Sequence, residues 1–133
     1  MLALRRGPGG RCPGSWEVVH GKIESGESPV TAALRELAEE TGLTPERFYN
    51  LSRTESFYLH RTDQLAMIPV FAAVVSTDAQ PKVSDEHDLF RWLPIAAAEG
   101  TLAWPRERRA VADLPTLLAG GTAGNLEDVL RVR

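Results

Sequence analysis

Three glutamates of this chain, Glu36, Glu39 and Glu40, are spaced so that a single α-helix would carry them close together. Residues three and four positions apart are neighbours on a helix surface, so the three carboxylates would repel one another. Helix propensity does not require such crowding, whereas a bound divalent cation would remove the repulsion. Hard oxygen ligands of this kind suit Mg²⁺ or Mn²⁺. The spacing therefore predicts a divalent-metal centre.

The helix that would carry these carboxylates has recognisable ends. Ser28 is a favoured N-cap, and Pro29 suits the first helical position because its missing N–H has no partner there anyway. Gly42 is a favoured terminator because glycine adopts the left-handed conformation easily. The side chains expected to pack inward recur at helical spacing, and they are Val30, Ala33, Leu34, Leu37 and Thr41.

A longer pattern, from Gly21 to Leu43, resembles the Nudix box at every defined position. Its order is Gly21, five residues, Glu27, seven residues, Arg35-Glu36-Leu37, one residue, Glu39-Glu40, one residue and Gly42-Leu43. Average composition would give this match by chance at about 10⁻⁹ or less per window. A solvated glutamate-rich surface is the ordinary alternative for three glutamates, but it does not account for the whole pattern.

The resemblance implies an α/β fold, a Nudix-type α/β/α sandwich with a mixed sheet, over a single domain comprising residues 1–133. It implies Mg²⁺, with Mn²⁺ as an alternative, held by the three helix glutamates and by the backbone carbonyl of His20. The family usually has glycine at this position, so His20 is a departure, and its side chain is expected at the rim of the site. Glu27 and Arg35 would pair and orient the metal ligands.

A second acidic segment, residues 84–94, resembles the loop that faces the box helix in the family. That loop often supplies one more carboxylate, as a metal ligand or as a base. We predict Glu86 for this role, with Asp85 and Asp88 as rivals and a solvated acidic turn as the alternative. Either Glu36 or Glu86 would accept the proton from the attacking water.

Substrate contacts are expected at two further places. Arg5 and Arg6 match a position where such families often hold a phosphate, although a solvated strand end is an equally good interpretation. Phe57 or Tyr58 could stack on a nucleobase, although each is more often a core residue. Residues 16–27 resemble the branch that includes dihydroneopterin triphosphate and dATP pyrophosphohydrolases.

Within that branch the expected reaction is hydrolysis of a nucleoside triphosphate or pterin triphosphate to the monophosphate and pyrophosphate. Dinucleoside polyphosphates, nucleotide sugars and capped RNA ends are alternative substrates, because the box is common to all of them. A non-catalytic nucleotide-binding module is a third hypothesis, which the intact glutamates disfavour.

The scaffold around the box is expected to alternate strands and short helices. Strands are predicted over residues 1–6, 16–19, 55–61 and 65–76, with a turn near residues 62–63. A helical turn is predicted over 94–99, a terminal helix over 104–119 with a break at Pro115, and a weak helix over 125–133. The arginines of the terminal helix are interpreted as surface charge.

Composition limits the setting. The net charge of −3 argues against general nucleic-acid binding, and the single Cys12 excludes an intrachain disulfide and favours the cytoplasm. The longest apolar run, residues 65–75, is too short to span a bilayer. The family normally has one more strand before Leu2–Arg6; either that strand is missing from this sequence, or a partner such as a second copy covers the sheet edge.

Overall fold

Two antiparallel β-sheets form the framework of the computed structural model, which describes residues 1–133. The first sheet has the order β2-β1-β5 and consists of β1 (Leu2–Arg6), β2 (Trp16–Glu17) and β5 (His87–Trp92). The second sheet pairs β3 (Arg47–Leu59) with β4 (Gln64–Val74). Helices and strands are both present, so the predicted α/β fold class is confirmed.

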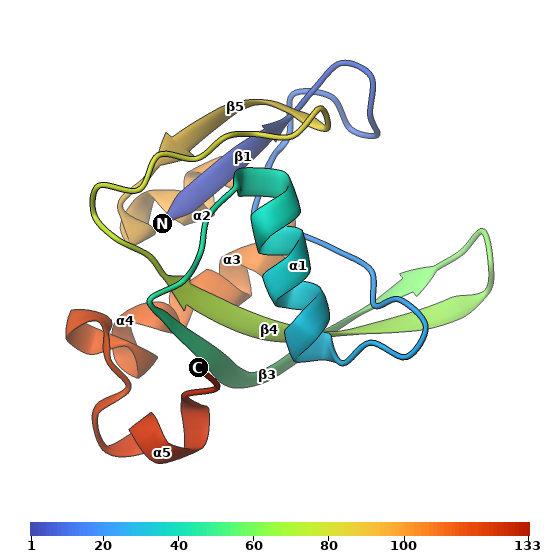
Figure 1. The fold of residues 1–133 in the computed structure, drawn as a ribbon. Coiled ribbons are helices and arrows are strands. Elements are labelled where there is room, and N and C mark those ends of the chain that lie inside the picture. The colour runs from blue at the N-terminus through green and yellow to red at the C-terminus, as the bar shows by residue number, and fades with distance from the viewer.

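The helices lie on two sides of these strands (Figure 1). In Figure 1, α1 (Pro29–Thr41) crosses the front of the strands, whereas α2 (Ala98–Thr101) and α3 (Pro105–Ala112) lie behind them. The remaining short segments are η1 (Ile95–Ala97), α4 (Leu114–Leu117), η2 (Ala119–Gly121), η3 (Gly124–Leu126) and α5 (Glu127–Leu130). None of the helices is long and apolar enough to cross a membrane.

The ends of α1 are those that the sequence predicts. The Ser28 hydroxyl accepts a hydrogen bond from the Thr31 amide at 3.1 Å, and Gly42 ends the helix in the left-handed region at φ 66°. The predicted inward face is only partly right. Leu37 and Thr41 are buried, but so are Ala32 and Glu40, whereas the other three predicted positions are half-buried.

The wider buried sector of α1 has a structural cause. The loop before β5 folds over the last turn of the helix, where the Lys82 amide donates to the Thr41 carbonyl at 2.8 Å. The Ser84 amide donates likewise to the Glu40 carbonyl at 3.1 Å. This loop covers a sector of the helix that hydrophobic periodicity alone assigns to solvent.

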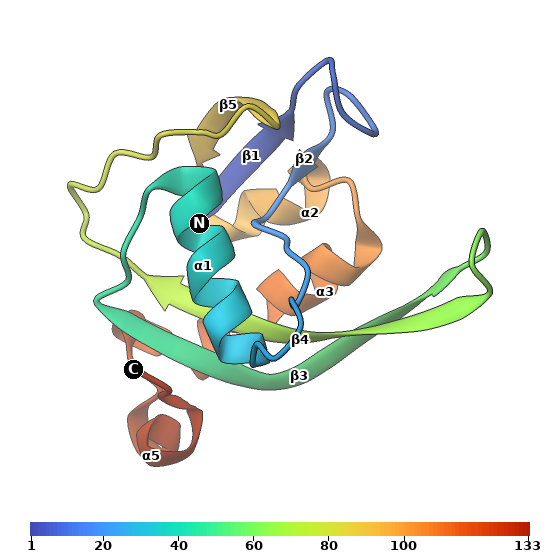
Figure 2. The same ribbon diagram turned by 45° about the vertical axis from the view of Figure 1, so that its right-hand side comes forward.

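Several predicted boundaries are wrong. Strand β3 begins at Arg47 rather than residue 55, and its outer half forms a long hairpin with β4 that projects to the right in Figure 2. The predicted terminal helix ends at Ala112 and resumes as α4, with Pro115 in the first turn of α4. Proline is tolerated there because the first helical amides have no intrahelical acceptor. The predicted final helix is reduced to η3 and α5.

Two apolar clusters hold the sheets and helices together. One contains Ala3, Ala98, Leu102 and Val111, and the other contains Tyr49, Leu51, Ala123 and Leu130. Leu114 packs against both clusters. The first cluster joins β1 to α2 and α3, and Trp16 of β2 packs against it. It therefore holds β1 and β2 beside α3.

Candidate active site

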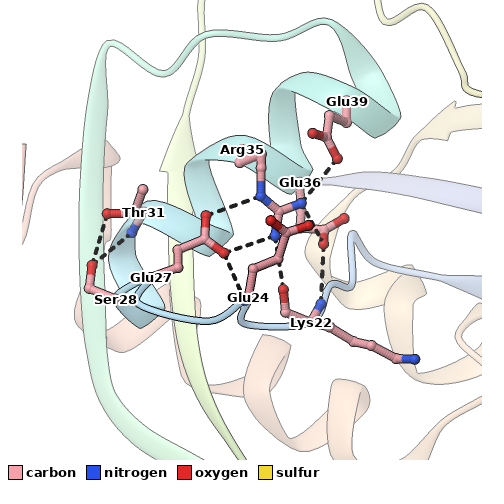
Figure 3. Close-up of polar contacts among 8 residues, drawn as sticks. All are labelled: Lys22, Glu24, Glu27, Ser28, Thr31, Arg35, Glu36 and Glu39. Atoms are coloured by element: carbon pink, nitrogen blue, oxygen red, sulfur yellow. Dashed lines mark hydrogen bonds and ion pairs between the residues drawn. The ribbon is translucent and has the colours of Figure 1, made fainter.

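Arg35 is the centre of a polar network that joins the loop before α1 to the helix (Figure 3). Its guanidinium donates to both carboxylate oxygens of Glu27 at 3.0 Å, to Glu36 at 2.9 Å and to Glu39 at 3.0 Å. It also donates to the Lys22 carbonyl at 2.9 Å. The Arg35–Glu27 pair that the sequence predicts is therefore present. Hydrogen bonding to Arg35 lowers the pKa of Glu27, so this carboxylate stays ionised.

Gly21 is required by the close approach of the loop to Glu36. A Cβ atom at this position would overlap the Glu36 side chain. The neighbouring Lys22 amide donates to Glu36 Oε1 at 3.1 Å. The first glycine of the box therefore lets the backbone pass against this carboxylate, and Arg35 and the Lys22 amide hold it in place.

Glu40 is a buried carboxylate that accepts a hydrogen bond from the His20 backbone amide but forms no salt bridge. Its exposed fraction is 8%, and its Oε2 atom has no hydrogen-bond partner. Burial, and then the nearby charges of Glu36, Glu86 and Glu17, raise its pKa to about 8. A buried carboxylate oxygen without a partner is costly, and a cation beside it would supply the missing interaction.

The three glutamates of α1 do not share one open face, which corrects the prediction. Glu39 has a side-chain exposure of 59%, that of Glu36 is 17%, and Glu40 points inward. Consecutive helical residues are about 100° apart, so Glu39 and Glu40 cannot point the same way. Glu36 and Glu40 are four residues apart and remain electrostatic neighbours. These two carboxylates fit a divalent cation best, because they are the less exposed pair and lie near each other; Arg35 donates to both Glu36 and Glu39.

A second group of possible metal ligands lies on the other side of the loop. Glu17, His20 and Glu107 each offer a ligand atom, and these atoms lie within 4.8 Å of one another. The His20 ring is paired with Glu107, which also accepts from the Val18 amide at 3.3 Å. His20 is thus half-buried against α3, and its side chain takes a specific partner rather than remaining free at the rim.

Sequence reasoning missed Glu17, Glu107 and His87. The buried His87 lies 3.1 Å from Glu17 Oε1 through its Nε2 atom, and its Nδ1 atom has no partner. Glu17 is an acid within an otherwise apolar strand, and Glu107 is the only acid among three arginines of α3. Both were available signals, because an isolated carboxylate in such a segment usually has a specific partner.

The two arginines at the end of β1 are paired with the acidic segment. Arg5 donates to both oxygens of Asp88 at 2.8 Å, and this contact lowers the pKa of Asp88. Arg6 donates to Glu86 at 2.6 Å and lies 3.4 Å from Glu17. Of the three predicted rivals, Asp88 is committed to Arg5, whereas Glu86 is exposed and close enough to Glu40 to raise its pKa.

Phe57 and Tyr58 point to opposite faces of β3, as consecutive strand residues must. The Tyr58 hydroxyl donates to Asp63 at the hairpin tip at 2.9 Å, so Tyr58 does not lie with the other predicted site residues. Phe57 faces α3, where its ring lies 4.9 Å from the Arg106 guanidinium. The interpretation of the α3 arginines as surface charge is wrong for Arg106 and Arg108, which are half-buried and each have an Nε atom buried without a partner.

Comparison with known proteins agrees with this architecture. The family model described as "NUDIX domain" matches residues 1–114. The chain is 37% identical over 113 residues to an octanoyltransferase of Myxococcus xanthus, covering 84% of this chain and 31% of that protein. It is 33% identical over 85 residues to the rat bis(5'-nucleosyl)-tetraphosphatase (asymmetrical), covering 62% of this chain and 58% of that protein.

Solved structures show the same fold. The dihydroneopterin triphosphate pyrophosphohydrolase of E. coli superimposes with a TM-score of 0.69 at 26% identity, covering 84% of this chain and 82% of that one. The chain spans less than two thirds of the length of the curated relatives described above. With a family model matched over most of its length and a box intact at every defined position, this chain belongs to the Nudix family.

Proposed function

We propose that this chain hydrolyses a phosphoanhydride bond of a nucleoside triphosphate-like substrate with Mg²⁺, or Mn²⁺, releasing a monophosphate and pyrophosphate. The observation that carries the proposal is the Glu40 carboxylate, buried beside Glu36 and Glu86 with one oxygen unpartnered. Without a cation this buried carboxyl keeps its proton up to about pH 8, whereas a bound cation would favour its ionised form and supply a partner for the free oxygen. The donor set consists of carboxylates and backbone oxygen, which suits a hard cation.

Glu36 and Glu40 would hold the metal with the His20 carbonyl and Glu86, and Glu39 would join them if it released Arg35. When bound, the cation neutralises the phosphate oxygens and lowers the pKa of a bound water. Arg35 and Glu27 position Glu36 through the contacts described above. Glu36 or Glu86 would accept the proton of the attacking water, and the exposure of Glu86 suits that task.

Three of the four predicted substrate contacts are retained in this proposal. Arg5 and Arg6 are paired with Asp88 and Glu86 and could exchange a carboxylate partner for a phosphate. Phe57 is the better candidate for a base platform, since Tyr58 is turned toward the hairpin tip. The similarity to the E. coli pyrophosphohydrolase supports a triphosphate.

A second candidate is hydrolysis of a dinucleoside polyphosphate. The similarity to the rat tetraphosphatase favours it, and the substrate choice of such a site depends on loops that the box does not define. A screen of nucleoside triphosphates, dinucleoside polyphosphates, nucleotide sugars and capped RNA, with identification of products, separates the candidates. Tight nucleotide binding without Mg²⁺-dependent turnover of any of them would instead support a binding module.

Two substitutions test the assigned ligands. Glu39→Gln is expected to lose most turnover while the fold persists, because a metal ligand is removed and repulsion is relieved. A wild-type rate at saturating Mg²⁺ would contradict the role of Glu39 as a metal ligand. Glu39 is paired with Arg35, so it can bind the metal only if it leaves this partner. Glu86→Gln tests the distal carboxylate, and an unchanged rate would transfer that role to Asp85 or Asp88.

A further inference from the structure

Arg106 makes an arrangement that differs from those of its neighbours in α3. Its guanidinium carbon lies 4.9 Å from the centre of the Phe57 ring and 4.7 Å from that of Trp104, over the face of each. It forms no salt bridge, and its Nε atom is buried without a hydrogen-bond partner. Arg109 by contrast pairs with Glu55. Arg108 also has a buried Nε atom without a partner, but its guanidinium donates to the Ala103 carbonyl instead of lying over aromatic rings.

Phe57 and Trp104, which we call the aromatic clamp, are linked to the acidic residues of the candidate site through Trp104. The Trp104 indole N–H donates to Glu17 Oε2 at 3.4 Å, and the other oxygen of Glu17 lies 3.4 Å from Arg6. Glu107 follows Arg106 in α3 and is paired with His20. The clamp therefore lies within a few side chains of the carboxylates that would hold the metal.

The position of the Arg106 guanidinium suits another planar group. Offset-stacked and edge-to-face aromatic pairs have centre-to-centre distances of about 4.5–7 Å. A heteroaromatic ring centred where the guanidinium carbon lies would be within that range of both Phe57 and Trp104. The two residues come from different elements, β3 and the start of α3, so the rings are held independently of Arg106.

We propose that the aromatic clamp binds the planar ring of the substrate, and that Arg106 occupies this site in the free protein and leaves when the ring enters. Stacking of the incoming ring replaces the two cation–π contacts. The departing side chain gains a partner for its Nε–H in water, which it lacks in the clamp. Arg106 is thus an internal competitor that lowers the apparent affinity for the ring, and this assignment rests on the proposed function.

The affinity effect has a defined direction. When only a fraction of the protein has an open clamp, the apparent dissociation constant rises by the inverse of that fraction. Removal of the Arg106 guanidinium should therefore tighten binding of a ring-bearing ligand by about threefold or more. The same change should leave a ligand without a ring unaffected.

The test is equilibrium binding to Arg106→Ala and to Arg108→Ala, a matched control in the same helix. The ligands are the α,β-methylene analogues of ATP and GTP, which resist cleavage at that bond, and inorganic triphosphate, which has no ring. We expect Arg106→Ala to bind at least one analogue about threefold more tightly, with triphosphate binding and the control unchanged. Weaker or unchanged binding of both analogues, or an equal change for triphosphate, would overturn the proposal.

Two further variants separate loss of the ring from misfolding. Trp104→Phe keeps an aromatic ring but loses the hydrogen bond to Glu17, and it should retain analogue binding. Phe57→Leu keeps apolar volume but loses the ring, and it should weaken analogue binding. Loss in both or in neither would contradict the clamp. Binding of the analogues does not depend on turnover, and hydrolysis of ATP and GTP is measured separately, so clamp-dependent binding without hydrolysis would reject the proposed function alone. Mg²⁺-dependent hydrolysis with no effect of these variants on binding would reject the clamp alone.

Discussion

Two buried glutamates of this protein have opposite electrostatic surroundings. Glu40 in α1 and Glu55 in β3 are 8% and 6% exposed. Arg109 and Arg53 each donate to Glu55 at 2.6 Å, and these hydrogen bonds lower its pKa below the usual range. Glu40 forms no salt bridge; the His20 backbone amide donates to it and Arg6 lies nearby, but burial, and then Glu36, Glu86 and Glu17, raise its pKa to about 8. Equal burial therefore produces opposite protonation behaviour.

The difference separates a structural carboxylate from a functional one. Glu55 pairs with Arg53 of the same strand and with Arg109 of α3, so its charge is compensated inside the protein and the Arg109 pair joins β3 to α3. Glu40 has no such ion pair and keeps its proton up to about pH 8, so we expect it to ionise at neutral pH only when a cation supplies the opposite charge. The two carboxylates should therefore respond differently to substitution, to pH and to removal of metal or of their partners.

The largest expected effect is on turnover. Glu40→Gln should reduce Mg²⁺-dependent hydrolysis by more than about 100-fold, because groups that only support metal ligands already account for 10–100-fold. Glu55→Gln is the matched control, since it makes the same chemical change at equal burial, and should stay within about twofold. Steady-state rates at saturating Mg²⁺ measure both. Equal losses in the two variants would remove the distinction between them.

The next effect is on the stability of the metal-free protein. The folded Glu40 carboxyl has a pKa of about 8 and keeps its proton up to that pH, whereas in the unfolded chain the carboxyl has its ordinary pKa of 4.5. The folded state thus binds more protons between these values, so stability is highest below the lower pH and falls as the pH rises toward the upper one. Glu40→Gln should abolish this fall and stabilise the protein by up to about 3 kcal/mol at pH 8.

Urea unfolding in EDTA between pH 5 and 9 measures this effect. Mg²⁺ should restore the wild-type stability at high pH and leave Glu40→Gln nearly unchanged, because metal binding favours the ionised carboxylate. A wild-type stability that rises from pH 5 to 8 in EDTA, with no difference from Glu40→Gln, would show that Glu40 is compensated by a group of the protein itself.

Contacts within α1 and its adjoining loop could be predicted from the sequence, whereas contacts between distant segments could not. The ends of α1, the Arg35–Glu27 pair and the proximity of Glu36 to Glu40 follow from spacings within one helix and its adjoining loop. The burial of Glu40 does not, because its side chain lies near Glu17 and His20, about 20 residues earlier, and Glu86, about 46 residues later. The contacts of Glu17 with His87 and Trp104 join positions 70 and 87 residues apart, and no local pattern encodes them.

A smaller effect is expected on the free energy of unfolding, to which Glu55 contributes through its two arginines. Glu55→Gln should lower the free energy of unfolding by about 1–2 kcal/mol at pH 7, since charge-assisted hydrogen bonds are lost but both arginines can turn to water. The lowered pKa means that the wild-type contribution is present above about pH 4.5 and disappears as the pH falls through the folded-state value. Urea unfolding at pH 7 and pH 3 should show the loss only at pH 7. A variant as stable as wild type at pH 7 would mean that the two arginines do not stabilise the fold through Glu55.

The smallest effect comes from removing one of the two arginines. Arg109 is half exposed, so Arg109→Met should destabilise by only about 0.5 kcal/mol at pH 7, while Arg53 keeps the Glu55 carboxylate ionised. Adding Arg53→Met should then cost more than the sum of the single changes, because Glu55 would become a buried carboxylate without a cation, as Glu40 is. The pKa of Glu55, followed by NMR, should rise in the double variant and stay low in each single one. If it stays low in the double variant as well, the arginines do not account for the difference between Glu55 and Glu40, and the backbone around β3 must do so.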